Sequence, residues 1–196
     1  MIGELTLDGQ LRSVLGALPM VMAVAARGIS KVIVPEPQAA EAALVEGIKV
    51  VGVRSLRQAI AAVTETEWPE APEVAPDSGE PLIRWRGEER LQDTDLADLL
   101  GMEDAKFALE VAASGGHHLM FTGPKGAGKT SLAERLPTIL PDLDRDEQLE
   151  LAAVHSLAGG LQPGAPLISR PPFRSPHHSA SRTAIRPPAC RVRSPC

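Results

Sequence analysis

The chain has 196 residues, 43% of them hydrophobic, and a formal net charge of −5. This composition excludes an intrinsically disordered chain and allows one medium domain or two small ones, at about 100 to 200 residues per domain. The mild negative charge gives no general attraction to nucleic acid or anionic lipid. We therefore expect a globular protein whose function lies in local features of the sequence.

One apolar run, residues 14–26, has the character of a targeting signal. It is shorter than the roughly 20 residues that a membrane helix needs, and Pro19 interrupts it. A secretory signal peptide fits less well than a buried helix, because acidic residues outweigh basic ones before the run. The two cysteines, Cys190 and Cys196, lack a second pair to complete a zinc site and fit a reducing compartment. We expect a cytoplasmic protein with no membrane partner.

Short β-like runs and helical runs alternate over residues 1–64. The former are rich in Val and Ile or are closed by the turn Asp8-Gly9, and the latter carry Ala and Leu at helical spacing. The expected strands are 4–7, 31–35 and 48–53, and the expected helices are 18–27, 38–46 and the residues after Ser55. Ser55 is the predicted N-cap of the last of these helices. The pattern predicts a mixed α/β domain over residues 1–64.

Prolines and carboxylates alternate in residues 65–81, which read ETEWPEAPEVAPDSGEP. Such a segment cannot bury enough apolar surface to offset its ordering entropy. We therefore predict an extended linker over residues 65–92 and a domain boundary there.

The sequence after the linker predicts two helices, a strand, a glycine-rich loop and a further helix. Leucines precede Gly101 at helical spacing, and a second helical pattern surrounds Leu109. The apolar run 117–123, HHLMFTG, is the predicted strand, and the helix begins near Thr130. Strand, loop and helix in this order are the context that a phosphate-binding loop requires.

The loop itself satisfies the pattern G-x-x-x-x-G-K-[ST] with Gly123, Gly128, Lys129 and Thr130. Glycines let the backbone turn so that N–H groups face phosphates, and the following helix adds its positive dipole end. Lys129 is predicted to reach the β- and γ-phosphates of ATP, and the Thr130 hydroxyl to bind the Mg²⁺ between them, while the Lys125 side chain points to solvent. The predicted nucleotide-binding residues are Gly123, Pro124, Lys125, Gly126, Ala127, Gly128, Lys129, Thr130 and Ser131. A chance match in a glycine-rich turn is the alternative, which the flanking strand and helix disfavour.

Catalytic residues are not identifiable in this sequence. No apolar strand that ends in Asp-Glu follows Thr130, and no arginine stands in a recognisable finger position. Nucleotide binding therefore does not imply nucleotide hydrolysis by this chain.

Three stretches of the later half together resemble one family: GPKGAGKTSLAERLPTILPDL, LELAAVHSLAG and RPPFRSPHHSASRTA. They resemble the magnesium-chelatase-like AAA+ ATPases of the bacterial YifB/ComM family. Residues 3–35 resemble the ribosomal-protein-S5-domain-2-like domain shared with the Lon protease. The resemblance implies a partial S5-domain-2-like (Lon-protease-like) domain at 1–64, followed by an incomplete P-loop NTPase (AAA+) domain at 93–184.

The chain departs from this family at three places. Pro19 stands where Lon-type enzymes carry a catalytic lysine, so we expect no peptidase activity. Gly101-Met102 stands where the family has Gly-Gln near the adenine pocket, which makes contacts to the base less certain than contacts to phosphate. Residues 185–196, IRPPACRVRSPC, form an atypical tail, and we interpret the chain as a fragment of a longer protein.

The resemblance implies an ATP-driven motor, a homo-hexameric ring in the full-length family, that processes DNA during recombination or natural transformation. One alternative is the magnesium chelatase motor subunit, which acts in porphyrin metallation. The other is a truncated nucleotide-binding module without turnover, which the missing acidic motif favours. The fused S5-like domain argues against the chelatase subunit.

Two smaller features of the sequence can each be interpreted in two ways. His177-His178 is interpreted as a structural or pore-facing segment of the family rather than a metal site. The arginines of the tail could contact phosphates of single-stranded DNA or could simply be solvated, and Phe173 is the one aromatic residue near them for base stacking. These arginines are Arg170, Arg174, Arg182, Arg186, Arg191 and Arg193.

Overall fold

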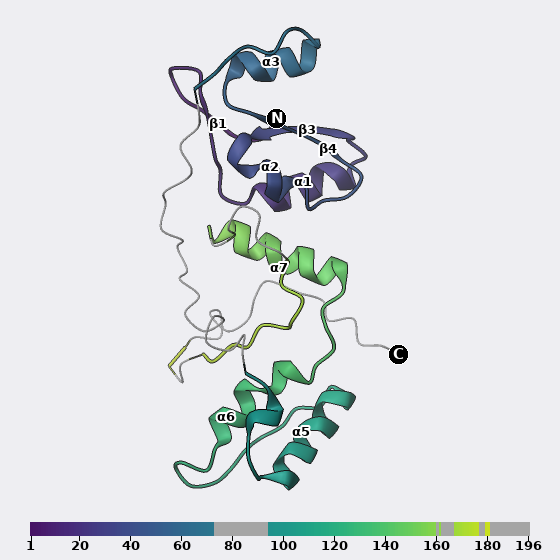
Figure 1. Ribbon diagram of the computed structural model, residues 1–196, viewed down its shortest axis with the longest axis vertical. Helices are drawn as coiled ribbons and strands as arrows, with labels where there is room; N and C mark the ends of the chain where they lie inside the picture. Colours follow the sequence, from purple (N-terminus) through teal and green to yellow (C-terminus); the bar gives the residue numbers. More distant parts are fainter. Residues whose placement is uncertain (73–93, 160, 162–166, 177–178, 181–196) are drawn as a thin grey trace. The chain divides into compact units, whose positions relative to one another are not determined.

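The computed structural model describes residues 1–72, 94–159, 161, 167–176 and 179–180. These residues form two compact units, and each is considered by itself. The first unit contains residues 1–72 and the described residues of 140–171, and the second contains 94–139 and the described residues of 172–180. Helices and strands are both present, as Figure 1 shows, so the predicted mixed α/β class is confirmed.

Two parallel strands, β3 (Lys31–Pro35) and β4 (Lys49–Val53), lie at the centre of the first unit. They are in register from end to end. A parallel pair needs a crossover connection, which here contains η1 (Glu36–Gln38) and α2 (Ala39–Ala42). Both strands were predicted from their Val-rich and Ile-rich sequences and are confirmed.

The side chains of β3 alternate between two hydrophobic clusters. Val32 and Val34 belong to a cluster that also contains residues of α1 (Ala17–Ala26) and α2. Ile33 belongs to a second cluster, with Ala59 of α3 (Leu56–Thr64). Successive side chains of a strand point to opposite faces, so one short strand supports helices on both sides of the pair. Figure 1 accordingly shows α3 across the strands from α1 and α2.

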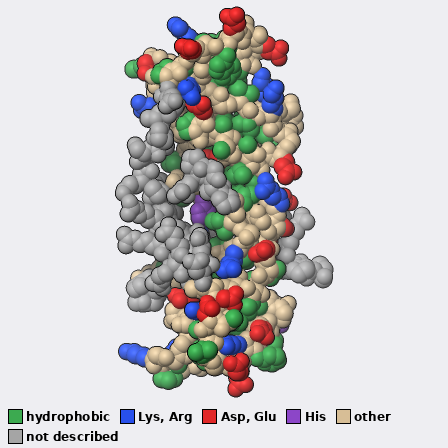
Figure 2. All heavy atoms as spheres, viewed as in Figure 1, with side chains coloured by type: hydrophobic (Ala, Val, Ile, Leu, Met, Phe, Trp, Pro, Cys, Tyr) green, Lys and Arg blue, Asp and Glu red, His purple; other side chains and the backbone are tan. Residues whose placement is uncertain are grey.

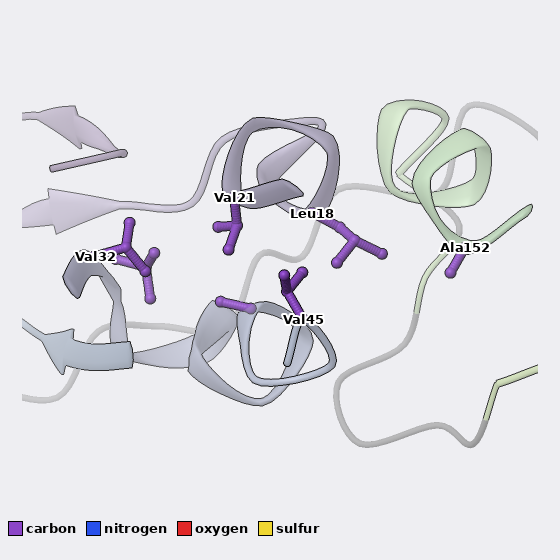
Figure 3. Packing of buried hydrophobic residues seen from close by; sticks show 7 residues of the cluster. Leu18, Val21, Val32, Val45 and Ala152 are labelled. Atoms are coloured by element: carbon purple, nitrogen blue, oxygen red, sulfur yellow. The ribbon is translucent and has the colours of Figure 1, made fainter. Parts of the chain in front are cut away.

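The helix α7 (Arg145–Leu157) belongs to the first unit although it lies far along the chain. Ala152 joins the cluster that contains Leu18, as Figure 3 shows. The N–H of Gly16 donates to the carbonyl of Ser156 at 3.1 Å, and the N–H of Leu18 donates to the Ser156 hydroxyl at 3.4 Å. These bonds satisfy N–H groups at the start of α1, which have no acceptor within that helix.

Two elements of the first unit are shorter than the sequence predicted. The strand expected at 4–7 is only β1 (Glu4–Leu5), paired antiparallel with β2 (Leu11–Arg12). The helix expected at 38–46 is reduced to α2, because the N–H groups of Leu44 and Val45 bond carbonyls three residues back and tighten the chain into turns. Ser55 does cap α3, accepting from the N–H of Gln58 at 3.3 Å, so that prediction is confirmed.

The second unit consists of short helical elements around a small core. They are η2 (Leu96–Asp98), α5 (Glu103–Gly115), α6 (Lys129–Glu134) and η3 (Leu136–Thr138). Leu96, Leu109 and Leu132 are buried together. The helices predicted around Leu109 and after the loop are confirmed, whereas the helix predicted before Gly101 is a single turn. It ends at Leu99, which is extended, and Gly101 has a left-handed backbone.

The predicted strand 117–123 is wrong: these residues have no regular secondary structure. A strand is defined by hydrogen bonds to a neighbour, and in the part of the second unit that the structure describes no other strand lies beside this segment. Leu119 and Met120 are therefore 42% and 83% exposed despite their apolar side chains.

The predicted domain division remains a prediction, with one difference in the structure. The described residues of 140–171, which it assigned to the later domain, pack in the first unit. The first residues of the predicted linker lie beside α3, where the Gln58 side-chain amide donates to the carbonyl of Pro69 at 2.9 Å. Most of that linker, and the atypical tail 185–196, lie outside the described residues.

Charged side chains of both signs are interspersed on the face shown in Figure 2. Hydrophobic side chains also reach this surface in both units. Within the described ranges, no helix is both long enough and apolar enough to cross a bilayer.

Candidate phosphate-binding loop

The loop between the irregular segment 117–122 and α6 is bent at its glycines. Gly123, Gly126 and Gly128 have φ values of 153°, 79° and 75°, which are conformations that residues with a Cβ rarely adopt. A Cβ built on Gly126 would meet nothing within 4 Å, so the middle of the loop faces open space. The glycine spacing noted in the sequence thus produces a bent, accessible loop.

Lys129, the first residue of α6, folds back over this loop. Its Nζ donates to the carbonyl oxygens of Gly123 at 2.9 Å and Pro124 at 2.6 Å. Lys125, within the same loop, is exposed, and its ammonium group bonds to none of the described residues. The two lysines of the loop therefore lie in different surroundings: one cation lies over the loop and the other faces solvent.

An open hollow of about 460 Å³ lies beside Lys129. Its walls come from the loop, from the segment before it, from the first turn of α5 and from α6. The lining residues are Met102, Glu103, Asp104, Ala105, Phe121, Thr122, Ala127, Lys129 and Leu132. The hollow thus combines the Lys129 ammonium group and the carboxylates of Glu103 and Asp104 with apolar side chains, chiefly Met102, Phe121 and Leu132. The apolar part suits the less polar portion of a ligand.

Met102 connects the start of α5 to the loop. It is the N-cap of α5 and has a left-handed backbone, with φ 57°. A Cβ built on Gly128 would lie 3.1 Å from both Sδ and Cε of Met102, so the thioether lies against the backbone of the loop. Met102 departs from the family pattern in the sequence, but its contact with Gly128 could not be predicted, because residues 26 positions apart on two elements carry no spacing signal.

The hydroxyl-bearing residues of the loop motif lie at the start of α6. Thr130 is exposed, and Ser131 is half-buried with its carbonyl accepting from the Arg135 guanidinium at 3.1 Å. Over the described ranges, the structure holds no cluster of three or more His, Cys, Asp or Glu side chains that could bind a metal. A Mg²⁺ ion here would therefore depend on phosphate oxygens, which suits an ion that is usually held by few protein ligands plus a nucleotide.

The other candidate residues from the sequence are not part of the loop. Arg170 and Arg174 are exposed and Phe173 is half-buried. The pair His177-His178, both cysteines and the remaining arginines of the tail lie outside the described residues.

The first unit has a hollow of similar size, about 470 Å³, at the carboxyl ends of β3 and β4. Glu36 follows β3, and its carboxylate accepts hydrogen bonds from Nε and Nη2 of Arg54, which follows β4. These hydrogen bonds hold the pKa of the Glu36 carboxyl below its ordinary value. Trp68 and Pro69 complete the wall, positioned by the bond from Gln58. The sequence analysis did not identify this hollow.

Two family models match separate parts of the chain. Residues 95–188 match the family model described as magnesium chelatase, subunit ChlI, and residues 1–38 match the model described as subunit ChlI of Mg-chelatase.

Three bacterial relatives illustrate the similarity. An uncharacterized protein of Mycobacterium tuberculosis is 45% identical over 194 residues. Competence protein ComM of Haemophilus influenzae is 37% identical over 185 residues, and the uncharacterized protein YifB of Escherichia coli K12 is 38% identical over 189 residues. Each alignment covers 94% of this chain and 34% or 35% of the relative. The chain thus spans about a third of the length of the curated relatives it matches.

Proposed function

Because this chain belongs to the magnesium-chelatase ChlI-like family and is of the YifB/ComM type, we propose that its loop binds ATP together with Mg²⁺. The observation that carries this proposal is the Lys129 ammonium group, which lies over the loop on the carbonyls of Gly123 and Pro124. Phosphate oxygens carry charge and are stronger acceptors than neutral carbonyls. Lys129 would exchange these carbonyls for the β- and γ-phosphates of ATP.

The other loop residues would bind around the phosphates. Backbone N–H groups of residues 125–131 would face the phosphate oxygens, as in other glycine-rich loops of this kind. The Thr130 hydroxyl would help to hold a Mg²⁺ ion, and the ion would supply positive charge that neutralises the phosphates. In the neighbouring hollow, the apolar side chains of Met102, Phe121 and Leu132 would contact the remainder of the nucleotide.

For this chain we propose binding without appreciable hydrolysis. Stabilising the transition state of phosphoryl transfer needs an acidic motif and an arginine that the sequence after Thr130 does not show. Peptidase activity is not proposed, because Pro19 has no ionisable group to serve as a base.

For the longer proteins of the family we propose an ATP-driven motor, assembled as a homo-hexameric ring in the cytoplasm, that processes DNA in recombination or natural transformation. The support is the family resemblance and the name of the competence protein that aligns with 94% of this chain. On the same basis we propose that residues 1–64 are part of an S5-domain-2-like fold and that 93–184 are part of an AAA+ domain. Porphyrin metallation, the alternative, is supported by the descriptions of the family models.

The matched pair of lysines tests the proposal. We expect Lys129→Ala to weaken binding of a fluorescent ATP analogue, in the presence of Mg²⁺, by about tenfold to a hundredfold, since a charge-assisted hydrogen bond contributes roughly 1.5 to 3 kcal/mol. Lys125→Ala should change the affinity by less than about threefold, because an exposed cation acts through screened attraction. Equal losses would contradict the assignment of the loop, and phosphate release that disappears in Lys129→Ala would contradict binding without turnover.

A further inference from the structure

Met102 differs from the other residues around the loop, because its backbone is in a conformation that its side chain disfavours. Gly101 and Met102 have φ values of 72° and 57°, and a left-handed backbone suits Gly101 and not Met102. A strained non-glycine residue persists where the surrounding structure over-determines it, and such residues cluster at functional sites. The strained backbone of Met102 therefore indicates that the contacts of its side chain are important.

The Met102 side chain contacts both the core of the second unit and the loop. It packs against the buried cluster that contains Leu109 and Leu132. Its Sδ and Cε lie against Gly128, where a Cβ would approach to 3.1 Å. Gly128 is the N-cap of α6, and its carbonyl accepts the N–H of Leu132 at 2.9 Å. Met102 therefore contacts the N-cap of α6 and also packs on the buried cluster of the second unit.

We propose that Met102 is a positioning residue for the phosphate loop: its thioether holds Gly128, and thereby the start of α6, so that Lys129 lies over the loop. This inference rests on the proposed function. The backbone of α5 fixes Met102 from the other side, since its carbonyl accepts the N–H of Lys106 at 2.9 Å. Met102 thus links the position of α5 to a loop whose middle faces open space.

Two substitutions separate the side chain from the backbone. Met102→Gly relieves the left-handed backbone and removes the thioether, whereas Met102→Leu keeps the bulk at the same φ. Binding of inorganic triphosphate with Mg²⁺ should weaken by about five- to tenfold in Met102→Gly and by less than about twofold in Met102→Leu. The free energy of unfolding, measured in urea, should fall in Met102→Gly by less than the free energy of triphosphate binding does. The relieved backbone strain offsets the lost side-chain contact.

Oxidation gives a second, independent readout. Hydrogen peroxide transfers one oxygen atom to the Met102 sulfur: an S–O bond forms, the O–O bond breaks and water leaves. The sulfoxide is larger and polar, so it should displace Gly128 and weaken triphosphate binding at least fivefold in the wild type. Met102→Leu should keep its affinity after the same treatment, and Met120, which is 83% exposed, serves as an oxidised control present in both proteins.

The outcomes distinguish this inference from the proposed function. If the wild type binds triphosphate, Lys129→Ala loses it and both Met102 variants match the wild type, the positioning role is wrong and the loop assignment stands. Equal losses from peroxide in the wild type and Met102→Leu would also overturn the positioning role. If the wild type does not bind triphosphate, both the proposed function and the inference fail.

Discussion

Residues 31–35 and 118–122 are both short, mostly apolar runs, and only the first is a strand. Residues 31–35 pair with β4 and have helices on both faces, so Val34 is fully buried. Residues 118–122 have no strand beside them in the described part of their unit, and Met120 is 83% exposed. The comparison teaches that apolar composition supplies the tendency to form a strand, whereas a neighbouring strand and a covering helix make one.

The same difference separates the two units as a whole. In the first unit, packing organises elements that are far apart in sequence, such as α1 and α7. In the second unit, a small core of leucines leaves one side of α5 uncovered by described residues, and Phe107 is 68% exposed. The first unit is organised by extensive hydrophobic packing, whereas the main feature of the second unit is its loop. Four measurements test this contrast.

The largest expected effect comes from the core of the second unit. Leu109→Ala, at a side chain that is 1% exposed, should lower the free energy of unfolding by about 2 to 5 kcal/mol. Phe107→Ala, two residues away in the same helix, should change it by less than about 0.5 kcal/mol. Urea denaturation of the two variants measures the difference. Similar losses would mean that the exposed face of α5 is packed in solution.

The next effect tests the packing of α7 in the first unit. Gly16 and Gly28 have nearly equal φ values, 75° and 76°, but a Cβ on Gly16 would lie 2.5 Å from Leu157 of α7, whereas a Cβ on Gly28 meets nothing. Gly28→Ala should cost about 1 kcal/mol of stability from backbone strain alone. Gly16→Ala should cost about 1 kcal/mol more, because Leu157 must move.

A double substitution provides the control for this comparison. Adding Leu157→Ala should remove the extra cost of Gly16→Ala and leave the cost of Gly28→Ala unchanged. If Gly16→Ala and Gly28→Ala cost the same from the start, α7 does not pack on α1 and the sequence-based division at residue 93 is the better description.

The smallest expected effect concerns the ion pair at the ends of β3 and β4. The hydrogen bonds from Arg54 lower the pKa of Glu36, so the pair stabilises the folded state at neutral pH. This contribution is lost as the pH falls through the lowered pKa of the folded protein. Glu36→Gln should therefore cost at most about 1 kcal/mol at pH 7, since the pair is partly exposed, and almost nothing in strong acid. Unfolding at several pH values checks this, and a cost that grows in acid would contradict the sign.

Local patterns made part of this structure predictable. The strands β3 and β4 follow from their Val and Ile content, the cap at Ser55 from its side chain, and the loop from the spacing of its glycines before Lys129. Each of these predictions was made from residues that are neighbours in sequence, and such local patterns are what a single sequence carries.

The features that were predicted incorrectly, or not at all, depend on contacts between residues that are distant in sequence. The strand predicted at 117–123 needed a partner that the run itself cannot reveal. The contacts between Gly16 and Leu157, and between Met102 and Gly128, join separate elements through side-chain shape. The Lys129 bonds to loop carbonyls were also not foreseen, because the sequence pattern concerns contacts to phosphate and not contacts within the loop.

Amide NMR of the labelled protein during titration with MgATP tests the central claim most directly, because the two units have hollows of similar volume. We predict that the largest shift changes occur at the backbone amides of Gly126, Gly128, Lys129 and Thr130, and that they saturate at one affinity. The largest changes at Gly52, Arg54 and Trp68 instead, or no saturable change at the loop, would contradict the assignment of residues 123–131 as the nucleotide site.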